Sequence, residues 1–203
     1  MAEQELQQIL HQIDSLKPST LQQAPQLLSR GKLALLKLDC LVPEPQTSPK
    51  HLFFATSLLE YGALVSIRLK DTEAFTRYFQ QLQPFYTLPD HRWSQQGRPR
   101  NQSKVTGLYL LLLLSQGDYA GFHTVLEGLE VSTGKEQLER DEFIQYPVRL
   151  EQALMEGSYD RVWGETKGER VPSEEFGVFS EVSCRHPLWA RTGIGADTLG
   201  CRS

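Results

Sequence analysis

Cysteine is scarce in this chain of 203 residues, which contains only three. Cys40, Cys184 and Cys201 lie far apart and form no CxxC pair, which argues against a disulfide framework and favours reduced thiols. Long apolar runs are also missing, because the longest, 105–114, has about half of the ~20 residues that a membrane-spanning helix needs. The N-terminal segment carries charges and lacks the apolar core of a signal peptide. These absences predict a cytoplasmic and nuclear protein without a membrane span.

Motifs for catalysis and for metal or cofactor binding are missing as well. The histidines show no HExxH motif and no metal-ligand spacing, and His123, beside an apolar stripe, favours a structural histidine. Cys184 and His186 put a thiol near an imidazole, but no helix fixes their geometry. The glycines of 193–197 follow no strand and complete no phosphate-binding fingerprint. We therefore predict no catalytic, metal-binding or cofactor-binding residue, no small-molecule substrate and no enzymatic activity.

Clustered acidic residues have a simpler interpretation than paired catalytic carboxylates. They fall at predicted helix starts, where the helix dipole favours negative charge. These residues are Glu139, Asp141 and Glu142, followed by Glu174 and Glu175. We expect all of them to be solvated.

Apolar residues recur with the 3.6-residue period of a helix along most of the chain, and no alternating strand pattern competes with it. The helices expected from this period cover 6–16, 21–41, 51–69, 71–82, 103–115 and 118–130. The third helix is apolar on more than one face, which is typical of a helix packed between neighbours. On the sixth, the predicted buried stripe consists of Tyr119, Phe122, Leu126 and Leu129.

A loose repeat runs through these helices. Short caps at Asp71, Asp118 and Ser158 each introduce a helix led by an aromatic residue. Spacings of 47 and 40 positions between them are in the range of two-helix repeats that stack into a solenoid. The fold class expected is therefore all-α, with antiparallel helix pairs stacked in a tetratricopeptide-like solenoid.

Residues 146–163 predict a helix start, a stop and a restart. Pro147 suits the first turn of a helix, where its missing N–H would be unpaired anyway. Gly157 can adopt the left-handed conformation that closes a helix, and Ser158 can cap the next one. The residues expected on the buried faces of the two helices are Leu150, Ala153, Leu154 and Met155, and then Tyr159, Val162 and Trp163.

A basic loop covers 87–104, against a net charge of −4 for the whole chain. Its cations are Arg92, Arg98, Arg100 and Lys104, with Asp90 as the one acid. Such a run is typical of a solvated loop, and the overall charge gives no reason to expect nucleic-acid binding. An RNA-binding adaptor stays open as an alternative function.

Four runs of sequence carry a resemblance to a known family. They are KLALLKLDCLVP at 32–43, LLEYGALVSIRLKDTEAFTRYFQQLQPFY at 58–86, LYLLLLLSQGDYAGFHTVLEGL at 108–129 and YPVRLEQALMEGSYDRVW at 146–163. In this order they resemble the small PCI-family subunits of the 26S proteasome regulatory-particle lid, over roughly 32–182. The sister PCI-type subunits of the COP9 signalosome and of translation initiation factor three have a similar helical half and stay open as alternatives.

The resemblance implies a PCI-type helical half and a non-catalytic scaffold role in lid assembly and ubiquitin-dependent protein degradation. It also implies contacts with other PCI-containing lid subunits and no membrane, small-molecule or nucleic-acid partner. In that family a winged helix and a terminal helix follow. Here the helical period stops near 182, so we expect a helical domain over 1–182, no winged helix, and a divergent, disordered tail over 183–203 that arises from a splice variant or a shifted reading frame.

Overall fold

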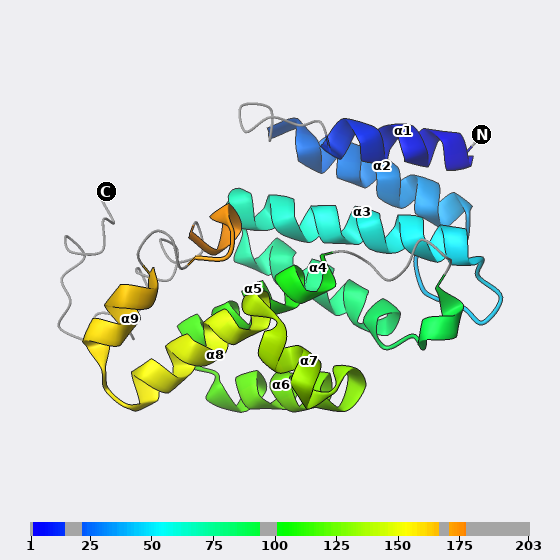
Figure 1. The fold of residues 1–203 in the computed structure, drawn as a ribbon. Coiled ribbons are helices and arrows are strands. Elements are labelled where there is room, and N and C mark those ends of the chain that lie inside the picture. Colours follow the sequence, from blue (N-terminus) through cyan, green and yellow to red (C-terminus); the bar gives the residue numbers. More distant parts are fainter. Residues whose placement is uncertain (1, 15–21, 94–100, 167–170, 178–203) are drawn as a thin grey trace. The chain divides into compact units, whose positions relative to one another are not determined.

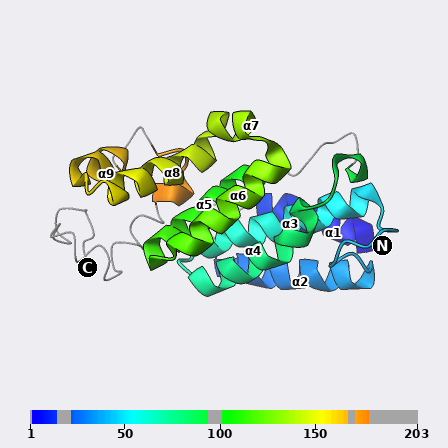
Figure 2. The ribbon, with the colours of Figure 1, turned by 90° about the horizontal axis from the view of Figure 1, so that it is seen from below.

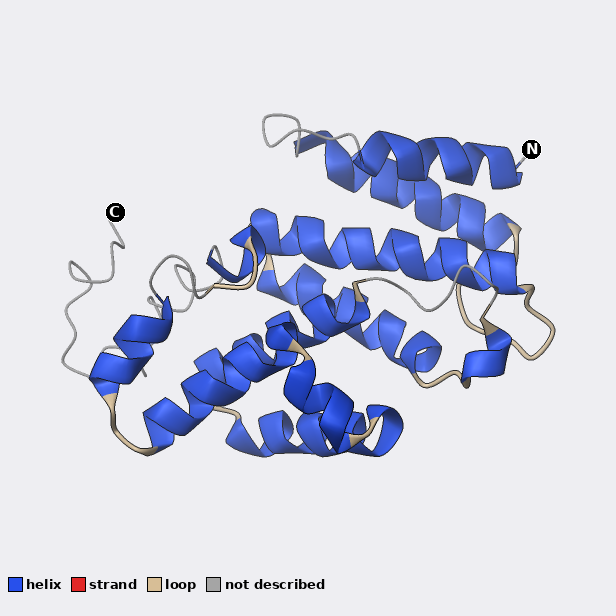
Figure 3. Cartoon of the chain, in the orientation of Figure 1, coloured by secondary structure: helices blue, strands red, loops and turns tan. Residues whose placement is uncertain are grey.

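The computed structural model describes residues 2–14, 22–93, 101–166 and 171–177, and within these ranges it contains helices and no strand (Figure 3). The all-α prediction is confirmed. The chain divides into two compact units, which we call unit 1 (Met1–Gln102) and unit 2 (Ser103–Ser203). The predicted tail, 183–203, lies outside the described residues. It contains Cys184, His186 and the glycines of 193–197.

Unit 1 holds the first four helices, and the second half of the chain holds the other five (Figure 1). The first group is α1 (Ala2–Asp14), α2 (Ala24–Lys37), α3 (Pro49–Arg68) and α4 (Thr72–Tyr86), followed by a 3-10 turn, η2 (Asp90–Arg92). The second group is α5 (Gln102–Gln116), α6 (Tyr119–Thr133), α7 (Lys135–Arg140), α8 (Glu142–Met155) and α9 (Tyr159–Thr166). Each unit contains antiparallel helix pairs, as the tetratricopeptide-like prediction requires.

The predicted repeat is visible in three helix-to-helix turns of the same design. Lys70, Gly117 and Gly157 have φ values of 60°, 74° and 67°, which place each of them in the left-handed region. The N–H of the residue that follows each of them donates to a carbonyl five residues earlier, which is the bond that closes a Schellman motif. In two of these turns the next residue, Asp71 or Asp118, also caps the following helix by accepting from a backbone N–H at 2.9 Å.

Helix α3 forms the centre of unit 1, between α2 and α4 (Figure 1). Its buried residues cover most of its circumference, which confirms the prediction of a helix apolar on more than one face. They are Leu52, Phe54, Ala55, Thr56, Leu58, Leu59, Glu60, Gly62, Ala63, Leu64, Val65, Ser66 and Ile67. Among these mostly apolar residues, Glu60 is a buried carboxylate.

Helix α2 is shorter than predicted, since it begins at Ala24 and ends at Lys37 rather than covering 21–41. The end is set by Asp39, whose φ of 51° is left-handed. The N–H of Cys40 then donates to the carbonyl of Leu35 at 3.1 Å and closes the helix. A left-handed aspartate gives a weaker sequence signal than a glycine, so the prediction placed the end at the prolines that follow.

The prediction that Pro147 lies in the first turn of a helix is wrong. Helix α8 begins five residues earlier, at Glu142, where Asp141 accepts a hydrogen bond from the N–H of Phe143 at 3.1 Å. Pro147 therefore lies inside the helix and offers no N–H to the carbonyl of Phe143. The glycine turn at Gly157 is as predicted.

Gly107 on α5 lies directly against the carbonyl oxygen of Phe143 that Pro147 leaves free, and an added Cβ would collide with this oxygen. The same Cβ would come within 3.1 Å of the Phe176 ring. We predict that Gly107→Ala lowers the free energy of unfolding by about 1–3 kcal/mol, because the packed surroundings must move apart. Urea unfolding measures this effect.

Gly128→Ala on α6 is the matched control, because its Cβ would meet no atom within 4 Å. An exposed helical glycine replaced by alanine should leave stability unchanged or raise it by about 0.5–1 kcal/mol. Equal effects of the two substitutions would refute the close approach of α5 and α8 at Gly107.

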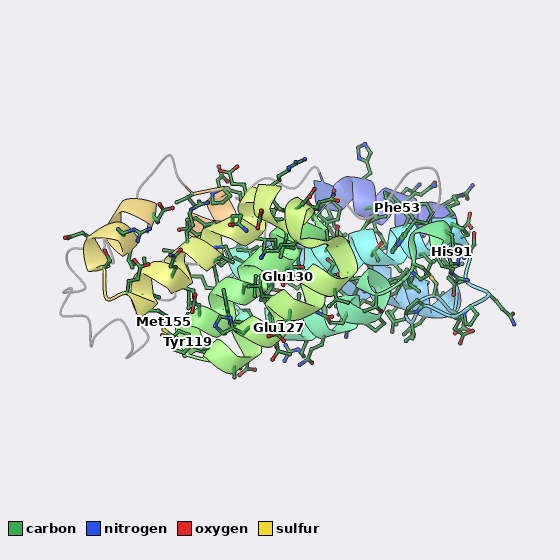
Figure 4. All side chains as sticks on the ribbon, turned by 60° about the horizontal axis from the view of Figure 1, so that its bottom comes forward. Phe53, His91, Tyr119, Glu127, Glu130 and Met155 are labelled. Atoms are coloured by element: carbon green, nitrogen blue, oxygen red, sulfur yellow. The ribbon has the colours of Figure 1, made fainter. Side chains whose placement is uncertain are left out.

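Several predicted buried positions are more exposed than expected. On α6 Phe122 is fully buried, whereas Tyr119, Leu126 and Leu129 are half-buried. Met155 at the end of α8 is 63% exposed and was wrongly predicted to be buried (Figure 4). Leu150, Ala153 and Val162 are buried as predicted, while Leu154 is half-buried. The side chains of Tyr159 and Trp163 lie outside the described part of the chain.

Candidate functional site

The described residues contain no group of three or more His, Cys, Asp or Glu side chains that could hold a metal ion. No helix among them is both long enough and apolar enough to cross a membrane. His123 is half-exposed, with its Nε2 3.5 Å from a carboxylate oxygen of Glu151 and its ring edge-on to Phe122. These are contacts within the fold, and they link α6 to α8.

The segment 171–177, which we call the closing segment, packs back onto α5 and α8 inside unit 2. Phe176 is fully buried, with ring centroids 5.9 Å from Phe143 and 5.7 Å from Tyr146. Both distances lie in the range favoured by aromatic pairs. The closing segment therefore completes the core of this unit.

An ion pair joins the closing segment to the start of α5. A carboxylate oxygen of Glu175 lies 2.8 Å from the Nζ of Lys104, and the two side chains are 3% and 19% exposed. The prediction that Glu175 is solvated is therefore wrong, although Glu174, Glu139 and Glu142 are exposed as expected. Asp141 is half-buried and acts as the cap of α8.

The basic loop, where the structure describes it, uses its cations for internal contacts. Lys104 pairs with Glu175, and Arg92 donates to the backbone carbonyls of Glu44 at 2.6 Å, Thr47 at 3.4 Å and Pro45. Arg92 therefore fixes the loop between α2 and α3. Arg98 and Arg100 lie outside the described residues.

A buried carboxylate on α3 forms a polar cluster that the sequence prediction missed. Glu60 is 2% exposed, and its Oε1 accepts from the hydroxyl of Tyr86 at 3.1 Å. Burial raises the pKa of Glu60 to about 7, against the lowering effect of hydrogen bonds from Tyr86 and Asn101. Burial and the neighbouring Glu60 raise the pKa of Tyr86 as well. No base faces Glu60 among these partners, so the cluster ties α3, α4 and Asn101 together rather than forming a catalytic pair.

Exposed apolar side chains provide the surfaces left for contact with other molecules. The large ones are Leu33, Leu36, Val42, Leu69, Val131 and Met155. Leu33 and Leu36 lie one turn apart on α2, and neither is among the residues predicted from the sequence to be buried on that helix, which are Leu27, Leu28, Leu35 and Leu38. Their absence from this predicted buried set is therefore the one signal of this surface that the sequence contained.

Comparison with known proteins indicates a family and a function, which the geometry of the fold does not identify. Residues 100–176 match the model of the CSN8/PSMD8/EIF3K family, from the start of α5 to Phe176 of the closing segment. The chain is 34% identical over 180 residues to the 26S proteasome regulatory subunit RPN12 of Saccharomyces cerevisiae. The chain is therefore similar to the CSN8/PSMD8/EIF3K family over these residues, and to a proteasome regulatory subunit over most of its length. The resemblance found in the four sequence runs is confirmed.

Two further relatives have similar names. The chain is 38% identical over 159 residues to the 26S proteasome regulatory subunit rpn12 of Schizosaccharomyces pombe. It is 40% identical over 139 residues to the 26S proteasome non-ATPase regulatory subunit 8 homolog A of Arabidopsis thaliana. The three alignments include 85%, 76% and 67% of this chain, but 64%, 53% and 49% of the respective relatives. The chain thus spans about half to two thirds of the length of these relatives.

Proposed function

We propose that this chain is a non-catalytic scaffold subunit of the lid of the 26S proteasome regulatory particle. The observation that carries the proposal is its identity of 34–40% to proteins named as proteasome regulatory subunits. The role proposed is lid assembly, in support of ubiquitin-dependent protein degradation in the cytoplasm and the nucleus. The proposed partners are other lid subunits that contain PCI domains.

Polar side chains of the described residues bond to other parts of the chain. This supports a role in protein–protein contact and not in catalysis. Glu60, Arg92 and Lys104 are bonded to other parts of the chain, and the imidazole of His123 lies 3.5 Å from the carboxylate of Glu151. The described residues hold no metal-binding cluster. We therefore propose no catalytic residue, cofactor or small-molecule substrate.

The alternatives receive less support. The family description includes the COP9 signalosome and initiation factor three, so the match over 100–176 does not separate them, whereas the named relatives are proteasome subunits. An RNA-binding adaptor would need free cations, and Arg92 and Lys104 are already engaged. Phosphate contacts would also predict a steep loss of affinity with salt.

Affinity purification of the tagged full chain, followed by mass spectrometry, tests the proposal. We expect the subunits of the proteasome lid to be enriched over those of the COP9 signalosome and of initiation factor three. Enrichment of either of the latter complexes, or salt-sensitive recovery of RNA without lid subunits, would contradict it.

A further inference from the structure

Helix α2 exposes two leucines in its C-terminal half, at positions where a helix of an isolated domain normally carries polar side chains. Leu33 is 58% exposed and Leu36 is 56% exposed. They are three residues apart and therefore adjacent on one face, whereas Leu28 and Leu35 of the same helix are buried. We call Leu33 and Leu36, with the exposed Arg30 and Lys37 beside them, the α2 outer face. Figure 2 shows α2 at the margin of unit 1.

The charges around this face are mainly positive. Helix α2 carries Arg30, Lys32 and Lys37 and no acidic residue. Arg30 meets Glu5 of α1 at 3.5 Å, in a pair whose two side chains are largely exposed. Such an exposed pair is weak and leaves the guanidinium accessible to a stronger partner. The face therefore favours a ligand that brings carboxylates.

Lys32, on the side of α2 that faces α4, is a second and independent indication that this face attracts carboxylates. Its ammonium group lies 3.9 Å from the centroid of the Tyr78 ring, which holds it in place. Burial lowers the pKa of Lys32, and the nearby positive charge of Arg77 lowers it further. Arg77 itself makes a long contact of 3.9 Å with the exposed Glu73. Two cations held together in this way would be stabilised by a carboxylate from outside the chain.

We propose that the α2 outer face binds a helix of a neighbouring lid subunit, and that this helix presents apolar side chains flanked by Asp or Glu. The inference rests on the proposed function. An α-helix is the fitting occupant because leucines one turn apart form a ridge that packs into the groove of a second helix. The flanking carboxylates would meet Arg30 and Lys37 on one side and Lys32 and Arg77 on the other.

A second copy of this chain could compete for the α2 outer face through its helix α6. That helix carries the carboxylates of Glu127 and Glu130 and no Lys or Arg, so it could meet the cations of α2 (Figure 4). Its outward side offers one large exposed apolar side chain, Val131, which is 89% exposed. The side chain of Val131 is too small to bury both Leu33 and Leu36 in a contact between two copies. The second copy is therefore the poorer match.

The test uses the full chain and a recombinant lid that lacks its RPN12-type subunit. We expect the double variant Leu33→Ser/Leu36→Ser to bind this lid about tenfold more weakly or worse, because two side chains lose their burial. Lys37→Glu should also weaken binding and make it less sensitive to salt. Val131→Ser on α6 is the matched control and should change the affinity by less than about twofold. Circular dichroism must show the same helix content and thermal midpoint for all variants.

A photo-crosslinker in place of Leu36 identifies the occupant directly. We expect it to react with a helix of another lid subunit that carries carboxylates next to apolar residues. Reaction with a segment that is basic or not helical would overturn the proposal. Self-association of the wild-type chain in sedimentation, lost in the double serine variant, would assign the face to a second copy and overturn it as well.

The outcomes separate this inference from the proposed function. If the wild-type chain binds the lid and the double serine variant binds equally well, the function stands and the docking face is wrong. If the wild-type chain fails to bind the lid at all, the proposed function is wrong, and the inference that rests on it is wrong too.

Discussion

Lys104→Met should destabilise the second half of the chain by about 3 kcal/mol, because the substitution removes the cation that lies 2.8 Å from the buried carboxylate of Glu175. Glu175 is 3% exposed and lies 2.8 Å from the lysine Nζ. Loss of the pair also loosens the closing segment that brings Phe176 into the core. Urea unfolding followed by circular dichroism at neutral pH measures the change.

The double variant Lys104→Met/Glu175→Met separates the effect of the missing cation from a loss of packing. With both charges removed, most of the stability should return, because apolar side chains can replace a buried ion pair at little net loss. Lys135→Met on the exposed surface of α7 should have almost no effect. A stable Lys104→Met variant would mean that Glu175 does not depend on this lysine.

Glu60→Gln should stabilise unit 1 at alkaline pH by about 2–3 kcal/mol and should have little effect at acidic pH. The folded pKa of Glu60, about 7, lies above the ordinary value of 4.5, so the folded state binds the proton more tightly than the unfolded state. The stabilising contribution of protonated Glu60 is complete below the unfolded pKa and is lost as the pH rises through about 7. Glutamine keeps an oxygen for the Tyr86 hydroxyl and never becomes charged.

The measurement compares the unfolding free energies of wild type and Glu60→Gln between about pH 5 and about pH 8, so that titrations elsewhere in the chain cancel in the difference. Glu73→Gln is the control on α4, since that side chain is 88% exposed. A difference that does not change with pH would refute the raised pKa. A destabilised glutamine variant at every pH would instead show that the negative charge itself is needed.

Periodicity was sufficient to predict α3 and the start of α4 because burial in these helices follows local rules. Asp71 caps α4 through its own side chain, and most of the buried residues of α3 are apolar. Gly157 ended α8 as predicted, because a left-handed turn strongly favours glycine. These features depend on a few adjacent residues and are therefore visible in the sequence.

The features that were missed depend on residues far apart in the chain. The position of Pro147 inside α8 goes with the packing of this helix against Gly107, which lies beside the carbonyl oxygen of Phe143 and far from it in the sequence. Glu175 was predicted to be solvated because its partner, Lys104, lies in another helix. The buried position of Glu60 likewise depends on Tyr86 and Asn101, which approach it only in the folded chain.

Native mass spectrometry of a recombinant proteasome lid that lacks its RPN12-type subunit, mixed with this chain, tests the central claim most directly. We predict a complex heavier by one copy of this 23.1 kDa chain. Matched preparations of the COP9 signalosome and of initiation factor three without their corresponding small subunits should gain no such mass. An unchanged lid, or a gain of mass in either of the other two complexes instead, would contradict the assignment.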